Sequence, residues 1–360
     1  MTGIADRAAP PRPVPPDPEV AAPVAAPSWR WLAGGAAALV AALVAGLTLG
    51  PAAISAQAVV SDLLSRLPLD IGTPLSQIDA TVLWELRAPR VALGALVGAM
   101  LAVAGGSYQA VFHNPLADPY LLGVAAGAGL GATVAIAYTG AGDRLLPLAA
   151  FVGAVVAVVA AYALGRSVGV ASGATLVLAG VAVAAFLAAA QTFVLQQNAE
   201  DVRAVYSWLL GRLSTSGWGD VAMVAPYIAV SVVTILLHAR VLDVLRVGDE
   251  EAASLGVAVT RVRLLVVVAA TLGTAAAVAV SGLIGFVGIV VAHAVRLLAG
   301  ASYRIVLPLS TLFGAAFLVL ADVVARTALS PAELPIGVVT ACIGAPFFAV
   351  VLRTTRRGEQ

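Results

Sequence analysis

Long apolar runs separated by short polar breaks dominate the chain. A hydrocarbon core about 30 Å thick needs about 20 apolar residues in a helix, and ten runs approach or reach that length. The breaks contain prolines, charged residues or glycine clusters, which end helices or favour water. The pattern therefore predicts an all-α, polytopic membrane protein with ten transmembrane helices. The predicted spans lie near residues 31–50, 91–111, 119–139, 145–164, 174–196, 221–239, 261–280, 284–299, 305–325 and 335–352.

Residues 1–27 differ from the rest of the chain because proline and alanine dominate them. Proline recurs too often for a helix, and few large apolar side chains are present to form a core. This stretch is predicted to be a disordered cytoplasmic tail. Residues 28–360 are then one ten-helix domain. The polar segment 51–86 lies between the first two spans, with a short amphipathic helix expected at 56–67.

Charge sets the expected orientation. Only 11% of the 360 residues are charged and 61% are apolar, whereas soluble domains carry about 25% charged residues. All 20 basic residues are arginine, and placing both termini in the cytoplasm puts 13 of them on the inner side, as the positive-inside rule favours. The seven arginines left outside are Arg66, Arg87, Arg90, Arg144, Arg203, Arg212 and Arg326.

Several classes of protein are excluded. The net charge is +1 and the arginines form no basic patch, so no nucleic-acid partner is expected. Without lysine the chain cannot contain a nucleotide-binding P-loop, and it does not hydrolyse ATP. One cysteine, Cys342, and three dispersed histidines predict no metal site. No catalytic motif is present, so the chain is not expected to be an enzyme or to hold a cofactor.

One segment of the longest cytoplasmic loop has the pattern of a short exposed helix. Three acids suit the positive end of that helix, and the final glycine suits its stop. Ala252, Ala253 and Leu255 would form a small apolar surface. From the loop alone, a partner-docking helix and a solvated connecting helix both remain open. Its residues are Gly248, Asp249, Glu250, Glu251, Ala252, Ala253, Ser254, Leu255 and Gly256.

The turn between the second and third spans is unusual because two prolines bound it, at Pro115 and Pro119. It holds Asn114 and Leu116, one polar and one apolar side chain, and the family resemblance described below implies that such a turn constricts a pathway and moves as a unit. A plain capping turn at the membrane surface is the alternative. Inside the spans, glycines recur four residues apart, which predicts close helix packing. Examples are Gly94 with Gly98, and Gly123 with Gly127 and Gly131.

A series of motifs across residues 81–353 resembles the permease family that imports ferric siderophores, haem and cobalamin, the type II ABC importers. One departure is visible, since Ala292 stands where the family usually has proline. The matching motifs are Arg87-Ala88-Pro89-Arg90, Gln109, Asn114–Pro119, Leu122-Gly123, Gly127-Ala128, Gly248–Gly256, Gly282–Gly288, His293, Arg296, Ala321–Arg326, Leu334–Gly337 and Gly344–Phe348.

The resemblance implies a function and a set of partners. Two permease chains, identical or merely similar, would form the pathway in the cell membrane. An extracytoplasmic binding protein would deliver the substrate, and two ATPase subunits would bind ATP and Mg on the inner side. Arg87, Arg90 and Arg326 match the binding-protein docking residues. The cytoplasmic gate matches Asn114, Leu116, Ser172, Gly173, Ala174 and Thr175, and the ATPase coupling helix matches Gly248–Gly256.

The leading hypothesis is therefore a multi-pass permease of the cytoplasmic membrane for a ferric siderophore, with haem or cobalamin open. The alternative is an ion- or proton-coupled secondary transporter, which would need acidic residues deep in the membrane. Asp322 is the clear candidate for that role, and it is spaced to pair with Arg326 on one helix.

Overall fold

The computed structural model describes residues 29–51, 54–65, 73–139, 145–167, 173–213 and 217–357. Within these ranges the protein is helical and contains no strand, and the one β-bridge pairs Leu329 with Ala332. The predicted all-α class is therefore confirmed. The predicted tail, residues 1–27, lies outside the described residues.

Seven helical segments of the described chain are long and apolar enough to cross a membrane. Three shorter apolar helices accompany them, and each of the ten predicted spans overlaps one of these ten segments. The count of ten crossings and the side of the termini stay predictions. The long segments are α1 (Trp29–Thr48), Gln77–Val111 ending in α4 (Ala88–Val111), α6 (Leu145–Ser167), α7 (Gly173–Gln197), α9 (Trp218–Leu237), α12 (Val259–Ser281) and α14 (Tyr303–Thr327). The shorter apolar helices are α5 (Val124–Thr139), α13 (Val287–Ala299) and the Ile336–Val351 part of α15 (Ile336–Arg357).

Short helices lie between these segments. The helix predicted at 56–67 is present as α2 (Ala56–Ser65), and the longest predicted cytoplasmic loop contains α11 (Asp249–Ser254). The remaining short elements are α3 (Gln77–Thr81), η2 (Val82–Arg87), η3 (Pro119–Leu122), η4 (Ala199–Asp201), α8 (Val202–Leu209), α10 (Ala239–Val244) and η5 (Leu245–Val247).

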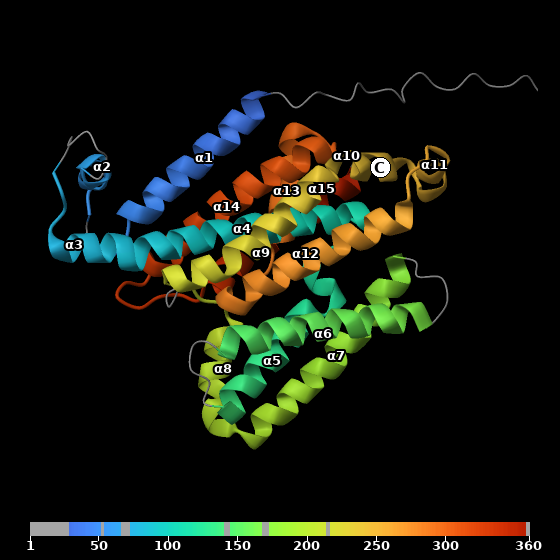
Figure 1. Cartoon of the computed structure of the whole chain (residues 1–360), viewed down its shortest axis with the longest axis horizontal. Coiled ribbons are helices and arrows are strands. Elements are labelled where there is room, and N and C mark those ends of the chain that lie inside the picture. Colours follow the sequence, from blue (N-terminus) through green and yellow to red (C-terminus); the bar gives the residue numbers. More distant parts are fainter. Residues whose placement is uncertain are drawn as a thin grey trace, which may run out of the picture.

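Helix α4 is the centre of the larger of two helix groups (Figure 1). It packs against α14, α12, α13 and α9, and most of its residues are buried. Helices α5, α6 and α7 form the second group, which joins the first mainly through contacts between α6 and α12. A helix apolar on all sides is covered by other helices or by lipid, and α4 is one that other helices of this chain cover.

Glycine permits the closest helix contacts, as the spacing predicted. A Cβ atom at Gly98 of α4 would overlap the carbonyl group of Gly314 in α14. A Cβ atom at Gly127 of α5 would likewise overlap Gly153 of α6. Both pairs bring backbones together at distances that no larger residue allows, which is how membrane helices gain packing energy in lipid.

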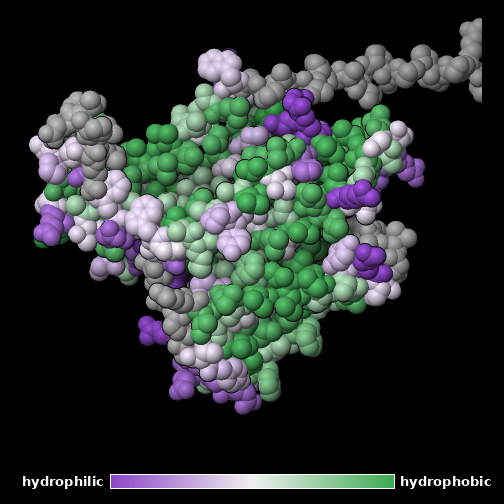
Figure 2. Space-filling view, in the orientation of Figure 1, coloured by the Kyte–Doolittle hydropathy of each residue, from purple (hydrophilic) through white to green (hydrophobic). Residues whose placement is uncertain are grey.

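The two ends of the molecule carry different short elements. Helices α2 and α3 lie at one end of the long axis, and α11 lies at the opposite end near the C-terminus (Figure 1). Hydrophobic side chains cover the middle of the face in view, while hydrophilic ones gather toward its ends (Figure 2). This distribution is the one that a protein needs when its middle contacts lipid and its ends contact water.

Candidate functional site

Arg87 and Arg326, two of the three predicted docking arginines, cap the C-terminal end of α1. Nη1 of Arg87 donates hydrogen bonds of 3.0 Å to the carbonyl oxygens of Leu47 and Thr48. Nη2 of Arg326 donates to the carbonyl oxygen of Gly46. The last carbonyls of a helix have no partner inside it, and cations there also meet the negative end of its dipole. Both arginines are buried, so each has a structural role within this chain.

Arg90, the third predicted docking arginine, holds two carboxylates at once. Its Nε donates to both oxygens of Asp322 at 2.9 and 3.0 Å. Its Nη1 and Nη2 donate to the two oxygens of Glu333 at 2.9 and 3.1 Å. Asp322 is 2% exposed, and Nε of Arg326 lies 3.8 Å from its Oδ2. The predicted pairing of Asp322 with Arg326 is therefore present, and Arg90 is the closer partner.

The structure thus brings Arg87, Arg90 and Arg326 together, each with a partner from the same chain. A polar cavity of about 170 Å³ lies beside Arg90, and its lining includes Arg212, Glu333 and Ser207. Arg212 follows α8 and was not among the predicted site residues. In the sequence, the one indication that Arg212 belongs to this site was its predicted position on the outer side of the membrane. Docking of a binding protein on this cluster stays a prediction.

The predicted gate turn is compact and partly exposed. Oδ1 of Asn114 accepts a 2.9 Å hydrogen bond from the backbone N–H of Leu116, which closes an Asx turn. His113 precedes it with φ of 49°, a conformation that β-carbon-bearing residues seldom adopt. The side chain of Leu116 is 45% exposed. The turn therefore presents an apolar side chain outward on a locally fixed backbone.

The second predicted gate segment lies at the start of α7. Gly173, Ala174 and Thr175 form its first turn, and Ser172 lies outside the described residues. Element η3, which follows the first gate turn, packs on α7. The contact is close because a Cβ atom at Gly180 would overlap the carbonyl oxygen of Leu121. The two gate segments are thus connected through η3.

Behind the gate turn, Asp118 caps η3 by accepting a 2.9 Å hydrogen bond from the backbone N–H of Tyr120. Removal from water raises the pKa of Asp118 to about 6, although that hydrogen bond acts in the opposite direction. The hydroxyl of Tyr120 donates to the carbonyl oxygen of Ile284 at 3.1 Å. The turn is therefore anchored to the segment before α13.

The segment predicted to be the coupling helix is helical, as α11, with Gly248 before it and Gly256 after it, and its coupling role stays a prediction. Both glycines have positive φ, at 121° and 84°, which larger residues rarely adopt. Leu255 is 70% exposed and the acids Glu250 and Glu251 face solvent. Ala252 differs from the expectation, because it is fully buried in the core and cannot belong to an exposed apolar surface. That surface is reduced to Ala253 and Leu255.

Two contacts tie this helix to the membrane helices, and sequence reasoning missed both. Nη2 of Arg263, in the second turn of α12, donates to Asp249 of α11 at 2.9 Å. Nε2 of His113 lies 2.7 Å from the carbonyl oxygen of Leu245, which belongs to η5 just before α11. Neither pair is close in sequence, so no local pattern signals it. The gate turn and α11 are therefore linked through a single short segment.

Among the described residues, no group of three or more histidine, cysteine, aspartate or glutamate side chains is arranged to hold a metal ion. A partly buried hydrogen bond joins Arg296 of α13 to Gln109 of α4, with Nη2 donating to Oε1. His293 stacks edge-on against Phe347 with ring centroids 6.0 Å apart. These motif residues therefore pack helices α4, α13 and α15 together.

Comparisons with known proteins agree with this arrangement. Residues 38–354 match the model of the FecCD transport family. The chain is 43% identical over 286 residues to the cobalamin import system permease protein BtuC of Halobacterium salinarum, covering 79% of this chain and 76% of that protein. It is 40% identical over 271 residues to the hemin transport system permease protein HmuU of Yersinia pestis, covering 73% and 80%.

A third relative is the Fe(3+)-citrate import system permease protein YfmD of Bacillus subtilis, 40% identical over 277 residues, with 76% and 82% covered. Among solved structures, an inward-facing metal-chelate type ABC transporter superposes with a TM-score of 0.80 at 28% identity. That match covers 91% of this chain and all of the other. The residues that the family model matches, 38–354, span most of the chain and contain every motif described above. This chain belongs to the FecCD transport family and is a multi-pass membrane permease.

Proposed function

We propose that this chain is the permease subunit of an ATP-driven importer for a ferric siderophore, haem or cobalamin. Two copies, or this chain and a similar one, form the pathway between them. A binding protein outside the cell delivers the substrate, and two ATPase subunits bind on the side of α11. The family match over residues 38–354 carries the proposal. The printed names of the relatives include cobalamin, hemin and ferric citrate, which leaves the substrate at the level of a class.

The geometry of α11 supports the ATPase contact. It is a short helix at one end of the molecule (Figure 1), with acidic side chains and Leu255 exposed. Its buried Ala252 and the Arg263–Asp249 ion pair fix it to the helical core. When a partner displaces a helix that is fixed in this way, the helical core moves with it. Movement of α11 would reach the gate turn through Leu245 and His113.

Exposed apolar side chains support a second permease chain. Helix α7 buries few of its residues in this chain and exposes Leu178, Phe186 and Phe193, at 70%, 72% and 60%. Large exposed apolar surfaces mark contacts with lipid or with another chain. Because α7 begins at the predicted gate, a partner chain packed along α7 would complete a pathway that one chain leaves open on that side.

The secondary-transporter alternative finds little support in the acidic residues of the helices. Such a transporter needs a carboxylate that is free to bind and release a cation within the membrane. Asp322 accepts two hydrogen bonds from Arg90 and lies near Arg326, so its charge is already compensated. Uptake that persisted without any ATPase and collapsed with the proton gradient would favour this alternative.

The proposal is tested in vesicles that contain the chain with its ATPase and binding protein. Replacing Glu250, Glu251 and Leu255 by alanine together should abolish ATP-driven uptake and leave membrane insertion unchanged. The matched control is L297A, because Leu297 is a leucine of equal exposure, 69% against 70%, on α13. Uptake and ATPase stimulation that both survived the triple replacement would refute the coupling assignment.

The substrate is identified through the binding protein, which selects it before the permease does. Tryptophan fluorescence of that protein is titrated with a panel of ferric siderophores, haem and cobalamin. A single ligand bound at least tenfold more tightly than the others would name the cargo. If the panel produced no quenching, the substrate would lie outside the proposed class.

A further inference from the structure

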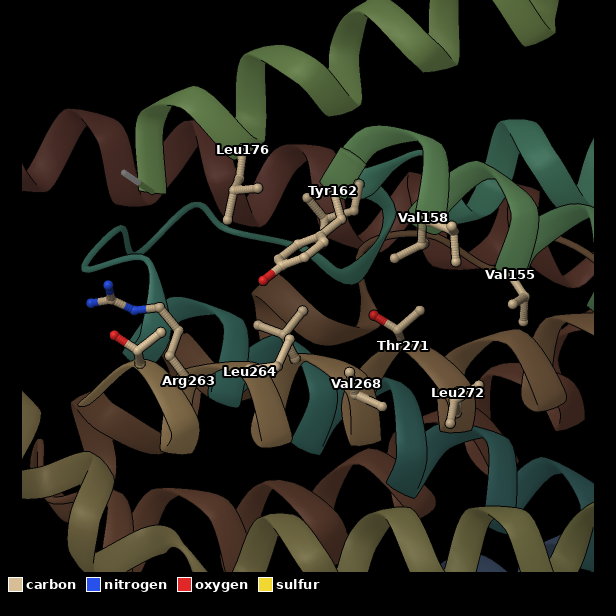
Figure 3. Close-up of a pocket in the computed structure, with 13 residues that line it drawn as sticks. Val155, Val158, Tyr162, Leu176, Arg263, Leu264, Val268, Thr271 and Leu272 are labelled. Atoms are coloured by element: carbon tan, nitrogen blue, oxygen red, sulfur yellow. The ribbon is translucent and has the colours of Figure 1, made fainter. Parts of the chain in front are cut away.

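The proposed transport pathway does not explain an apolar groove that lies between α6 and α12. Its volume is about 380 Å³ and its walls are almost entirely apolar. Val155, Val158 and Tyr162 line it from α6, and Leu264, Val268 and Leu272 line it from α12 (Figure 3). Leu264 and Val268 are 42% and 45% exposed within the chain. A preformed apolar groove of this kind on a membrane helix pair suits a hydrocarbon chain.

The length of the groove matches one leaflet of a bilayer. Its α12 wall runs from Thr260 to Leu272, and the mostly apolar part from Arg263 to Leu272 is about 14 Å long at 1.5 Å per residue. Half of a hydrocarbon core is about 15 Å thick. The wall residues recur every three or four positions, so they form a stripe along one face of each helix. The groove therefore extends from the end of α12 that adjoins α11 to about the middle of α12.

Polar residues gather at one end of this groove. Arg263 and Thr260 line it near the start of α12, and the Tyr162 hydroxyl points into it toward Arg263 (Figure 3). The guanidinium of Arg166 lies 5.9 Å from the Tyr162 ring centre and is exposed at the end of α6. Two arginines thus lie at the mouth of an apolar groove, where a lipid headgroup would sit.

Arg263 also has hydrogen-bonding capacity that the chain does not use. Asp249 accepts from its Nη2, while its Nε is buried and has no hydrogen-bond partner among the described residues. Buried donors are nearly always satisfied, so an unmatched one indicates a missing partner. A phosphate group suits this place, because guanidinium binds phosphate with paired hydrogen bonds.

We propose that an anionic phospholipid binds here, with one acyl chain in the α6–α12 groove and its phosphate on Arg263. A phosphate paired with the unused Nε would also use the neighbouring Nη2, so it competes there with Asp249, which accepts from Nη2. Occupancy by lipid would therefore loosen the only ion pair between α11 and α12 that involves described residues. A consequence for ATP coupling rests on the proposed function, whereas binding of the lipid does not.

The test measures lipid binding to the delipidated full-length chain without any ATPase. Dioleoyl phosphatidylglycerol and dioleoyl phosphatidylcholine are titrated in detergent, and bound lipid is counted by native mass spectrometry. We expect one phosphatidylglycerol to bind in preference to phosphatidylcholine. R263Q should weaken that binding about tenfold, the worth of one or two charge-assisted hydrogen bonds. D249N should strengthen it about threefold, since it removes the competing anion.

Two further variants separate a built site from general attraction. R261Q removes the same charge two residues away, on an exposed residue that does not line the groove, and should bind as the wild type does. V268W fills the groove without a change of charge and should abolish binding even if R263Q fails to fold. Equal weakening by R261Q and R263Q, or equal binding of the two lipids, would overturn the proposal. Failure of the uptake test above would leave these lipid measurements unaffected.

Discussion

Nε2 of His113 lies 2.7 Å from the carbonyl oxygen of Leu245, across 132 positions of sequence. The carbonyl can only accept, so the histidine donates from Nε2. This bond connects the turn that holds Asn114 and Leu116 to η5, which leads directly into α11. Two segments that sequence alone treats as separate loops thus form one structural unit, and the proposed mechanism depends on their moving together.

Removing this bond should weaken coupling more than folding. H113A loses one hydrogen bond between partly buried groups, worth about 1 kcal/mol, which corresponds to about a fivefold change in an equilibrium. We expect ATP-driven uptake to fall severalfold while the melting temperature changes by a few degrees. The matched control is H238A, because the His238 ring bonds, among the described residues, to the carbonyl oxygen of Thr234 one turn earlier in the adjoining helix α9. Equal loss of uptake in both variants would contradict a specific role for His113.

The two acids on Arg90 should differ in their contribution to stability. Asp322 is 3% exposed at its side chain and Glu333 is 38% exposed. Removing one partner of a buried ion pair costs about 3–5 kcal/mol, because a charge is left without compensation, whereas an exposed pair is worth about 0–1 kcal/mol. D322A should therefore lower the melting temperature strongly in detergent, and E333A only slightly. A larger effect of E333A would show that the exposed pair is the dominant one.

The Gly98–Gly314 contact predicts a sharp difference between two glycine substitutions. A Cβ atom at Gly98 would overlap the backbone of Gly314, so G98A should destabilise the fold by about 1–3 kcal/mol through overpacking. Gly34 of α1 has no atom within 4 Å of its Cβ position. G34A should then be neutral, or stabilising by up to about 1 kcal/mol from helix propensity. Thermal unfolding of both variants distinguishes the two, and an unchanged melting temperature in G98A would refute the close contact.

Asp118 should make stability depend on pH in a defined direction. Its pKa is about 6 in the folded chain and about 4 in an unfolded one, so the folded state favours the protonated form. The resulting stabilisation is fully present below about pH 4 and is lost as the pH rises through about 6. D118N keeps an acceptor for the Tyr120 N–H and removes the titration. Melting temperatures from pH 4 to 8 should fall in the wild type relative to D118N, and a relative rise would contradict the assignment.

Much of the architecture could be predicted because it depends on local pattern. Apolar runs of membrane length predicted the helices, and the ten expected spans coincide with helices of the described chain. Glycines four residues apart predicted close packing, which Gly98 and Gly127 show. The acids and glycines around α11 predicted its start and its stop. In each case the signal lies within a few neighbouring residues, although the helices that Gly98 and Gly127 contact are not named by it.

The partners of the charged side chains could not be predicted in the same way. The predicted topology places Arg87 and Arg326 on the outer side of the membrane. In the structure both side chains are buried and donate hydrogen bonds to the carbonyl groups at the end of α1. Ala252 looks like part of an exposed surface, yet it is buried in the core. These outcomes depend on which distant helix end lies beside each residue, and sequence spacing carries no such information.

By itself, the sequence determined that this chain is a bundle of apolar helices with a short acidic helix in one loop. The hydrophobic effect and backbone hydrogen bonding impose these features segment by segment. Only the tertiary structure decided that His113 meets Leu245, that Arg90 holds Asp322 and Glu333, and that Arg263 stands between Asp249 and an apolar groove. Such contacts join residues far apart in the chain, so they exist only once the helices have packed.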